Sequence, residues 1–165
     1  MIIDFQNLTL DIDIEKTKSY YNTAEAVSVC SCQGCRNYEK AVDRLPKEVV
    51  SFFSQIGVDI KKAREVYVNN ANTDHTIFYA GWYHVCGKLV EKETALVYND
   101  ITGYHQAGEK AYVITNDFKV TFSSDCNILD SRFPLPAFQL DILANIPWVL
   151  EEDIDCEMFE RISFR

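Results

Sequence analysis

Three cysteines lie within six residues, in the segment Cys30-Ser31-Cys32-Gln33-Gly34-Cys35. Thiols at this density can hold a metal ion, exchange with disulfides, or pack as small apolar side chains. Cys32 and Cys35 have the Cys-x2-Cys spacing that places two thiolates on one turn around zinc. Gly34 lets the loop between them fold tightly. The cluster therefore indicates chemistry more directly than any other part of the chain.

A zinc ion takes four ligands in a tetrahedron, so the three cysteines leave one position to be filled from elsewhere. Cys30 supplies the third thiolate if its segment bends away from strand geometry. His84 and Cys86 are the best candidates for the fourth, because a spacing of two in a strand directs both side chains to one face. The sequence holds no second Cys-x2-Cys pair and no His-x3-His pair. The predicted zinc ligands are therefore Cys30, Cys32, Cys35, His84 and Cys86.

Two alternatives for the cluster stay open. The Cys32–Cys35 pair directly precedes a predicted helix, and a helix N-terminus lowers the pKa of a thiol. Such a pair could exchange with disulfides or use Cys32 as a nucleophile, although the strand–helix–strand context of a thioredoxin-like fold is missing. The other alternative is three reduced thiols that only line a loop. Cys126 and Cys156 are isolated in the sequence, and we interpret both as packing residues.

The remaining candidate residues each have a structural explanation. His84 is either a ligand or general base, or a core histidine that is hydrogen-bonded within a sheet. His75 and His105 fall in polar stretches and are expected at the surface. Trp82 and Trp148 are interpreted as core anchors rather than as markers of a binding groove.

No catalytic or nucleotide-binding motif is present. The acidic run over residues 151–157 lacks the central glycine of an EF-hand loop, so we expect a solvated acidic surface. The sequence has no Gly-x-Ser-x-Gly motif, no phosphate-binding loop and no dinucleotide fingerprint.

Charge and length restrict the class of protein. The 165 residues favour one globular domain over residues 1–165. Sixteen basic and 25 acidic residues give a net charge of −9, which argues against nucleic acid or an anionic membrane as a partner and is compatible with a basic protein partner. The sequence shows no basic leader and no apolar run near the ~18 residues of a membrane span. We therefore expect a cytoplasmic protein, in which thiols stay reduced.

The first part of the chain predicts a strand followed by two helices. Residues 8–14 alternate between apolar and polar, which predicts a strand with one buried face, and residues 15–22 are predicted as a loop. Apolar residues recur at i, i+3, i+4 and i+7 over 38–45, with Asn37 as the expected N-cap. The same spacing recurs over 49–56 after a break at Pro46.

The rest of the chain predicts mainly strands. A tight hairpin turn is expected at Asn116-Asp117, because both residues tolerate positive φ. The predicted strands cover residues 77–90, 94–98, 111–115, 118–122, 137–142 and 159–164. This order predicts an α+β fold with a mainly antiparallel sheet and a two-helix segment near the N-terminal third.

Five short motifs, one of which is Leu45-Pro46, resemble an uncharacterised bacterial protein family, a domain of unknown function. The other four are Cys32-Gln33-Gly34-Cys35-Arg36-Asn37-Tyr38, Ile56-Gly57-Val58-Asp59, Gly81-Trp82-Tyr83-His84 and Pro147-Trp148-Val149-Leu150. The resemblance implies a bacterial, intracellular single-domain protein and no particular activity. Cys30 does not belong to the family pattern.

These observations lead to one main hypothesis and two alternatives. We expect a non-enzymatic binding or interaction domain whose cysteine cluster holds a structural zinc ion. The alternatives are a thiol-dependent enzyme or redox protein that uses Cys32 and Cys35, and an immunity-type or regulatory module that binds a basic protein.

Overall fold

A computed structural model describes residues 1–5, 8–25, 30–90, 96–99, 101, 104–107 and 111–154 of the protein. Its strands are β1 (Ile2–Phe5), β2 (Leu8–Ile12), β3 (Glu65–Ala71), β4 (Thr76–Leu89), β5 (Leu96–Asn99), β6 (Tyr104–Ala107), β7 (Tyr112–Thr115), β8 (Phe118–Ser123) and β9 (Ala137–Pro147). Its helices are α1 (Ile14–Thr23), α2 (Gln33–Ala41) and α3 (Lys47–Gln55), with single 3₁₀ turns η1 (Val42–Arg44) and η2 (Ile60–Lys62).

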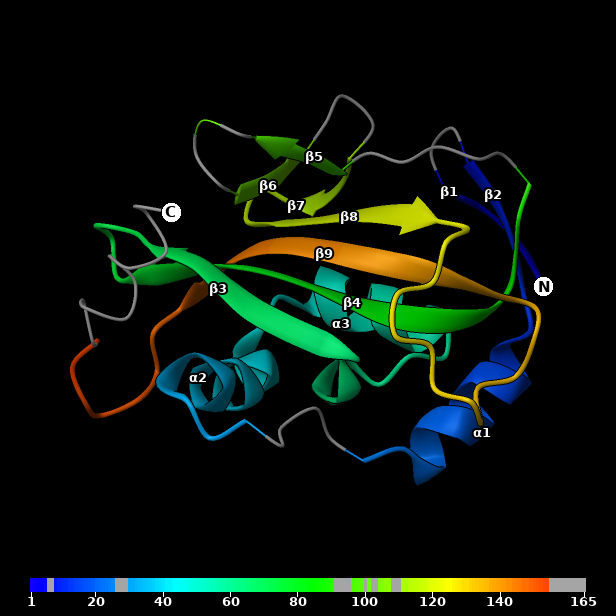
Figure 1. The fold of residues 1–165 in the computed structure, drawn as a ribbon, viewed down its shortest axis with the longest axis horizontal. Coiled ribbons are helices and arrows are strands. Elements are labelled where there is room, and N and C mark those ends of the chain that lie inside the picture. Colours follow the sequence, from blue (N-terminus) through cyan, green and yellow to red (C-terminus); the bar gives the residue numbers. More distant parts are fainter. Residues whose placement is uncertain are drawn as a thin grey trace.

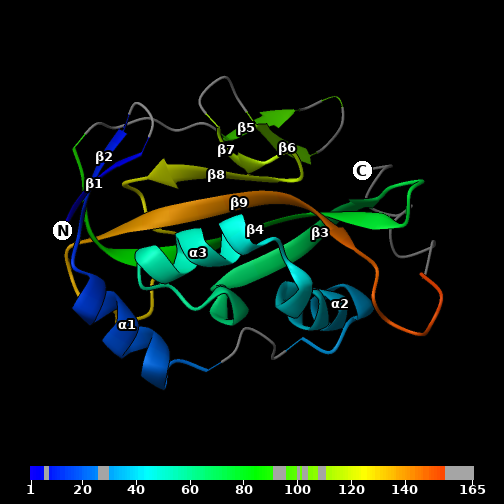
Figure 2. The same cartoon turned by 180° about the vertical axis from the view of Figure 1, so that it is seen from behind.

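One antiparallel sheet forms the centre of the molecule. Its strands follow the order β1-β2-β4-β9-β8-β7, with β3 also paired to β4, and β5 and β6 form a separate hairpin. Every strand pair among the described residues is antiparallel. Figures 1 and 2 show α2 and α3 on one side of this sheet. The predicted α+β class, with a mainly antiparallel sheet, is confirmed.

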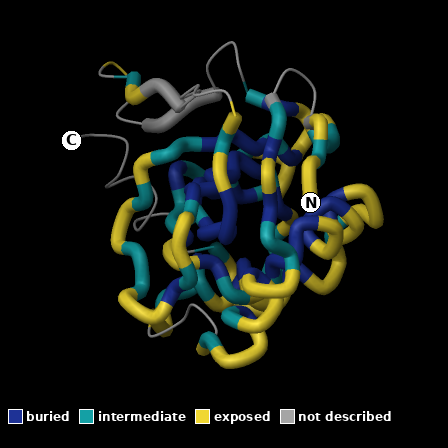
Figure 3. The backbone as a smooth tube through the Cα atoms, turned by 90° about the vertical axis from the view of Figure 1, so that its right-hand side faces the viewer, coloured by how far each residue is buried: buried dark blue, intermediate teal, exposed yellow. Residues whose placement is uncertain are grey.

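The core lies between the helices and the two longest strands. β4 and β9 pair from Thr76↔Pro147 to Cys86↔Ala137. The helix-facing side of β4 carries Tyr79 and Tyr83, both fully buried, and Tyr83 packs edge-on against Phe53 of α3. Figure 3 shows the buried segments gathered in the interior, with exposed segments around them. The apolar faces predicted for the two helices therefore cover the sheet.

The helix α2 begins earlier than the sequence predicts. We expected Asn37 as its N-cap, but Cys32 takes that position and Asn37 lies one turn inside the helix with no exposed surface. The prediction is wrong because the Asn37 amide donates to the Tyr79 hydroxyl and to the Pro147 carbonyl, and not to the backbone at the start of its own helix. The predicted break at Pro46 is confirmed, since α3 starts at Lys47.

Residues 15–22, predicted as a loop, belong to the helix α1. The strand predicted over residues 8–14 ends at Ile12, and the Asp13 side chain caps the helix by accepting from the Lys16 backbone N–H. The buried face of α1 is formed by Thr17 and Tyr21, four residues apart. The helical pattern was missed because these two buried residues carry hydroxyl groups and do not form an aliphatic stripe.

Two hydroxyl groups of α1, those of Thr17 and Tyr21, bond to the backbone along an edge of β4 where no described strand pairs with it. One edge of β4 pairs with β3 up to Trp82 and with β2 from Gly87 onward, which leaves a gap between the two strands. Within that gap, the Tyr21 hydroxyl donates to the His84 carbonyl and accepts from the His84 backbone N–H. The Thr17 hydroxyl accepts from the Cys86 backbone N–H. A helix therefore satisfies buried backbone groups that a strand would otherwise bond.

Replacing Tyr21 by phenylalanine is expected to lower the free energy of unfolding by about 1–3 kcal/mol, because it leaves the buried backbone N–H and C=O of His84 without their partner. Urea denaturation of the two proteins measures the difference. Removing the exposed hydroxyl of Thr23, by Thr23→Val, serves as the control and should change stability far less. Equal stability of Tyr21→Phe and the parent protein would contradict this role of α1.

The other strand predictions have mixed outcomes. The hairpin at Asn116-Asp117 is confirmed between β7 and β8, although neither residue has the positive φ from which it was predicted. The strand predicted over 94–98 is described only from Leu96 onward, as β5, and the strand predicted over 159–164 lies outside the described residues. Strands β1, β3 and β6 were not predicted. None of the helices in the described part of the chain combines the length and the apolar character needed to cross a bilayer.

Candidate metal centre

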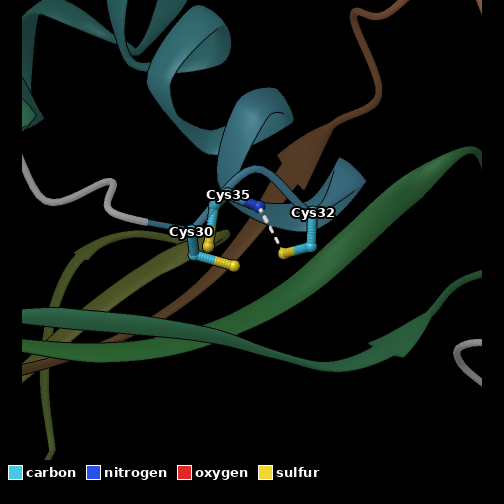
Figure 4. A group of neighbouring side chains, drawn as sticks. All are labelled: Cys30, Cys32 and Cys35. Atoms are coloured by element: carbon cyan, nitrogen blue, oxygen red, sulfur yellow. Dashed lines mark hydrogen bonds between the residues drawn. The ribbon is translucent and has the colours of Figure 1, made fainter.

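The first turn of α2 positions the cysteine cluster. Cys32 has an extended backbone conformation at the N-cap, and the Cys35 backbone N–H points at its sulfur, with an N–Sγ distance of 3.5 Å. Cys30 lies two residues before the cap and is exposed. Figure 4 shows the three side chains converging below this turn. The local fold at a helix start therefore brings together residues that a straight strand would separate.

The sulfur atoms lie close enough to share one ion. The Sγ atoms of Cys30, Cys32 and Cys35 all lie within 4.8 Å of one another. Thiolates bound tetrahedrally to zinc at about 2.3 Å would lie about 3.8 Å apart. Rotation of the side chains can shorten the sulfur–sulfur distances to this value, because Cys30 is exposed and Cys32 and Cys35 are only half-buried.

The three thiols have different electrostatic surroundings. Hydrogen bonds from the Cys32 backbone, the Cys32 thiol and the Cys35 thiol lower the pKa of Cys30. Burial raises the pKa of Cys35, and the neighbouring thiols raise it further. These contacts favour negative charge on the exposed Cys30 sulfur and disfavour it on Cys35. A metal ion must displace the proton of Cys35, so binding should strengthen as pH rises.

The cluster loop is docked on the sheet through Gly34. The Gly34 carbonyl accepts from the Tyr79 hydroxyl at 2.8 Å. A Cβ atom at Gly34 would lie 2.6 Å from Cγ2 of Val68 on β3, so the absence of a side chain permits this close approach. The loop and the sheet thus hold the cluster at one place in the fold.

His84 and Cys86 do not join this cluster. Both were predicted as candidates for the fourth ligand, and among the described residues the only group able to hold a metal is Cys30, Cys32 and Cys35. Tyr79, which reaches the cluster loop, lies five residues before His84, or about 17 Å along an extended strand, and on the opposite face. His84 and Cys86 do share one face of β4, as predicted, but Tyr79 meets the cysteine cluster from the other face.

The chain after β9 passes beside the cluster. Arg36 forms an ion pair with Glu152, and the Gln33 side chain donates to the Asp153 carbonyl. Sequence reasoning treated Glu152 as part of a solvated acidic surface, and no local pattern predicts its pairing with α2. Cys126 is half-buried and lies outside the cluster, and Cys156 lies outside the described residues.

Comparison with protein-family models, curated proteins and solved structures finds no match for this chain. The family resemblance and the bacterial, cytoplasmic setting inferred from the sequence therefore stay predictions.

Proposed function

We propose that the protein is a non-enzymatic, zinc-binding interaction domain in which three thiolates fix the start of α2 against the sheet. The observation that carries this proposal is the set of three sulfur atoms within 4.8 Å of one another. Thiolate ligands favour zinc over harder cations such as magnesium and calcium. Neither His84 nor Cys86 is part of the proposed site.

The fourth coordination position faces solvent on the Cys30 side. Cys30 is the exposed member of the cluster, while Cys35 is half-buried on the first turn of α2. Water, or a side chain of a protein partner, would complete the tetrahedron there. A partner that supplies this ligand would be held both by the metal and by the surface around it.

The surface around the cluster carries charges of both signs. Arg36 and Glu152 form an exposed ion pair next to the cysteines, and Glu151 and Asp153 are exposed beside it. Zinc would order the loop that presents this surface. A basic protein partner fits the net charge of −9.

Cobalt(II) should bind the purified, reduced protein with one equivalent per chain and give a strong near-ultraviolet absorption from thiolate-to-cobalt charge transfer. The absorption should fall stepwise when one or two cluster cysteines are replaced by serine, since each thiolate contributes to it. Cys126→Ser is the matched control and should leave the spectrum unchanged, because Cys126 lies outside the cluster.

A wild-type spectrum without charge transfer would contradict the proposal. The hydrogen bonds that lower the pKa of Cys30 and the nearness of its sulfur to the other two support a dithiol–disulfide pair as the second candidate. In that reaction, two thiols give two electrons and two protons to oxidised glutathione, which becomes two reduced glutathione molecules. Cobalt-free protein that forms a Cys30 disulfide with oxidised glutathione would favour this candidate.

A further inference from the structure

The three sulfur atoms of the cysteine cluster are a complete ligand set for an ion other than zinc. Zinc in a structural site takes four ligands, so the three cysteines fill three of its four positions. Monovalent copper is a soft cation with a closed shell, and three thiolates satisfy it in a plane without a fourth ligand. In the described part of the chain, Cys30, Cys32 and Cys35 form one group of mutually close ligands (Figure 4). The number of sulfur atoms that the fold brings together therefore matches copper(I).

The spacing of the sulfur atoms suits a planar arrangement. In a trigonal site with metal–sulfur bonds of about 2.3 Å, the sulfur atoms lie about 4.0 Å apart. The Sγ atoms of Cys30, Cys32 and Cys35 all lie within 4.8 Å of one another. Cys30 is exposed, so rotation of its side chain can bring its sulfur closer to the other two. A trigonal site thus needs only small movements of the sulfur atoms.

The cluster loop is packed against apolar and aromatic side chains of the sheet. Gly34 approaches Val68 of β3 so closely that no Cβ fits between them, and its carbonyl accepts from the Tyr79 hydroxyl at 2.8 Å. Tyr79 is fully buried, and Cys35, the residue after Gly34, is half-buried. An apolar surrounding limits solvent access and tunes the redox potential of a bound metal. This side of the site favours the lower charge of copper(I) over that of copper(II).

The charges around the cluster also bear on the choice of ion. Three thiolates with copper(I) carry one more negative charge than the same thiolates with zinc. The positive end of the α2 dipole offsets part of it, and the Cys35 backbone N–H points at the Cys32 sulfur. The Glu65 carboxylate disfavours negative charge on Cys30, but both side chains are exposed and water screens the repulsion. The extra charge therefore falls at the hydrated side of the cluster.

We propose that this cluster binds monovalent copper through the three thiolates alone and that copper displaces zinc from it. The inference rests on the proposed function, because it concerns the same three sulfur atoms. No electron is transferred: one copper(I) ion enters, one zinc ion leaves, and the thiolates stay reduced. The exchange removes the open fourth position that zinc offers to a partner. Copper would therefore release a partner that is held through that position.

An anaerobic titration of the zinc-loaded, reduced protein tests this exchange. Copper(I) is supplied as its bathocuproine disulfonate complex, and a chromophoric zinc chelator measures the zinc that is released. We expect one zinc ion to leave for each copper ion bound, up to one per chain. Competition with the same two chelators should give an affinity for copper(I) at least about a hundredfold tighter than that for zinc.

X-ray absorption at the copper edge of the wild-type protein counts the ligands and requires no variant. We expect three sulfur neighbours and no nitrogen or oxygen neighbour. Cys30→Ser should weaken copper binding about tenfold or more, because it removes one of the three ligands. Cys126→Ser is the matched control and should bind copper as the parent protein does, since Cys126 lies outside the cluster.

The outcomes separate this inference from the zinc site itself. If zinc stayed bound while copper(I) was added in excess, or if the bound copper had two or four ligands, the copper proposal would be overturned and the zinc site would stand. A protein that bound neither ion would overturn both proposals.

Discussion

Replacing Cys32 by serine is expected to weaken zinc binding by roughly a hundredfold. Structural zinc contributes about 10–16 kcal/mol of apparent binding free energy in small domains, so one of four ligands accounts for about 3 kcal/mol. Cys32 has a second function as the N-cap of α2, where its sulfur accepts from the Cys35 backbone N–H. Serine keeps a capping oxygen at this position, so the helix start should survive while the metal ligand is lost. Competition with a chromophoric chelator measures the affinity.

The comparison with the other cysteines makes this test specific. Cys30→Ser and Cys35→Ser should weaken zinc binding by a similar factor, since both sulfurs belong to the same group. Cys126→Ser should bind zinc as the parent protein does. Affinities that are unchanged in all three cluster variants would show that any bound metal lies elsewhere in the protein.

Asn37→Ala is expected to lower the free energy of unfolding by roughly 2–4 kcal/mol, the second large effect. The Asn37 amide nitrogen donates to the Tyr79 hydroxyl at 3.1 Å and to the Pro147 carbonyl at 3.2 Å. Its oxygen accepts from the Val149 backbone N–H at 2.7 Å. Alanine would leave the Pro147 carbonyl and the Val149 N–H without these hydrogen bonds, while the Tyr79 hydroxyl keeps its bond to Gly34. Each group left unsatisfied costs about 1–3 kcal/mol. Chemical denaturation measures the loss.

Asn22→Ala is the control for this substitution. Asn22 is an exposed residue of α1, and replacing it by alanine changes the helix propensity by the same amount as Asn37→Ala does. It should change stability by a few tenths of a kcal/mol at most. Asn37→Asp keeps the acceptor for Val149 but removes both donors, so its loss should remain large. If the Asn37 and Asn22 variants were equally stable, the Asn37 amide would not be fixing α2 to the end of β9.

Asn37 also connects the fold to the candidate metal centre. The Tyr79 hydroxyl that accepts from Asn37 donates in turn to the Gly34 carbonyl, within the cysteine loop. The same buried contacts therefore hold both the second turn of α2 and the loop between Cys32 and Cys35. Loss of Asn37 should weaken zinc binding as well as stability, because the cysteines would be less well held in place.

Periodicity predicted the parts of the fold that depend on apolar residues. The stripes of Tyr38, Ala41 and Phe53 identified α2 and α3, and the residues of β4 and β9 alternate as strands do. The helix α1 was missed because its buried contacts are hydroxyl groups bonded to the backbone of β4. A hydrophobic pattern cannot predict such contacts, because they depend on a strand far along the chain. Tyr21 and His84 are 63 residues apart in the sequence.

The candidate site was predicted in part. The spacing of Cys32 and Cys35 indicated a shared turn, and the helix start that they form also draws in Cys30. The choice of His84 and Cys86 rested on their common face, but a strand has two faces and the sequence does not tell which one meets the cysteine loop.

The most direct test of the central claim is elemental analysis of the protein purified with zinc present, paired with a count of reactive thiols. We predict about one zinc per chain, with three of the six thiols protected from labelling until a chelator is added. A protein that carries no zinc after this treatment, with its cluster thiols labelled at the same rate before and after the chelator, would contradict the account.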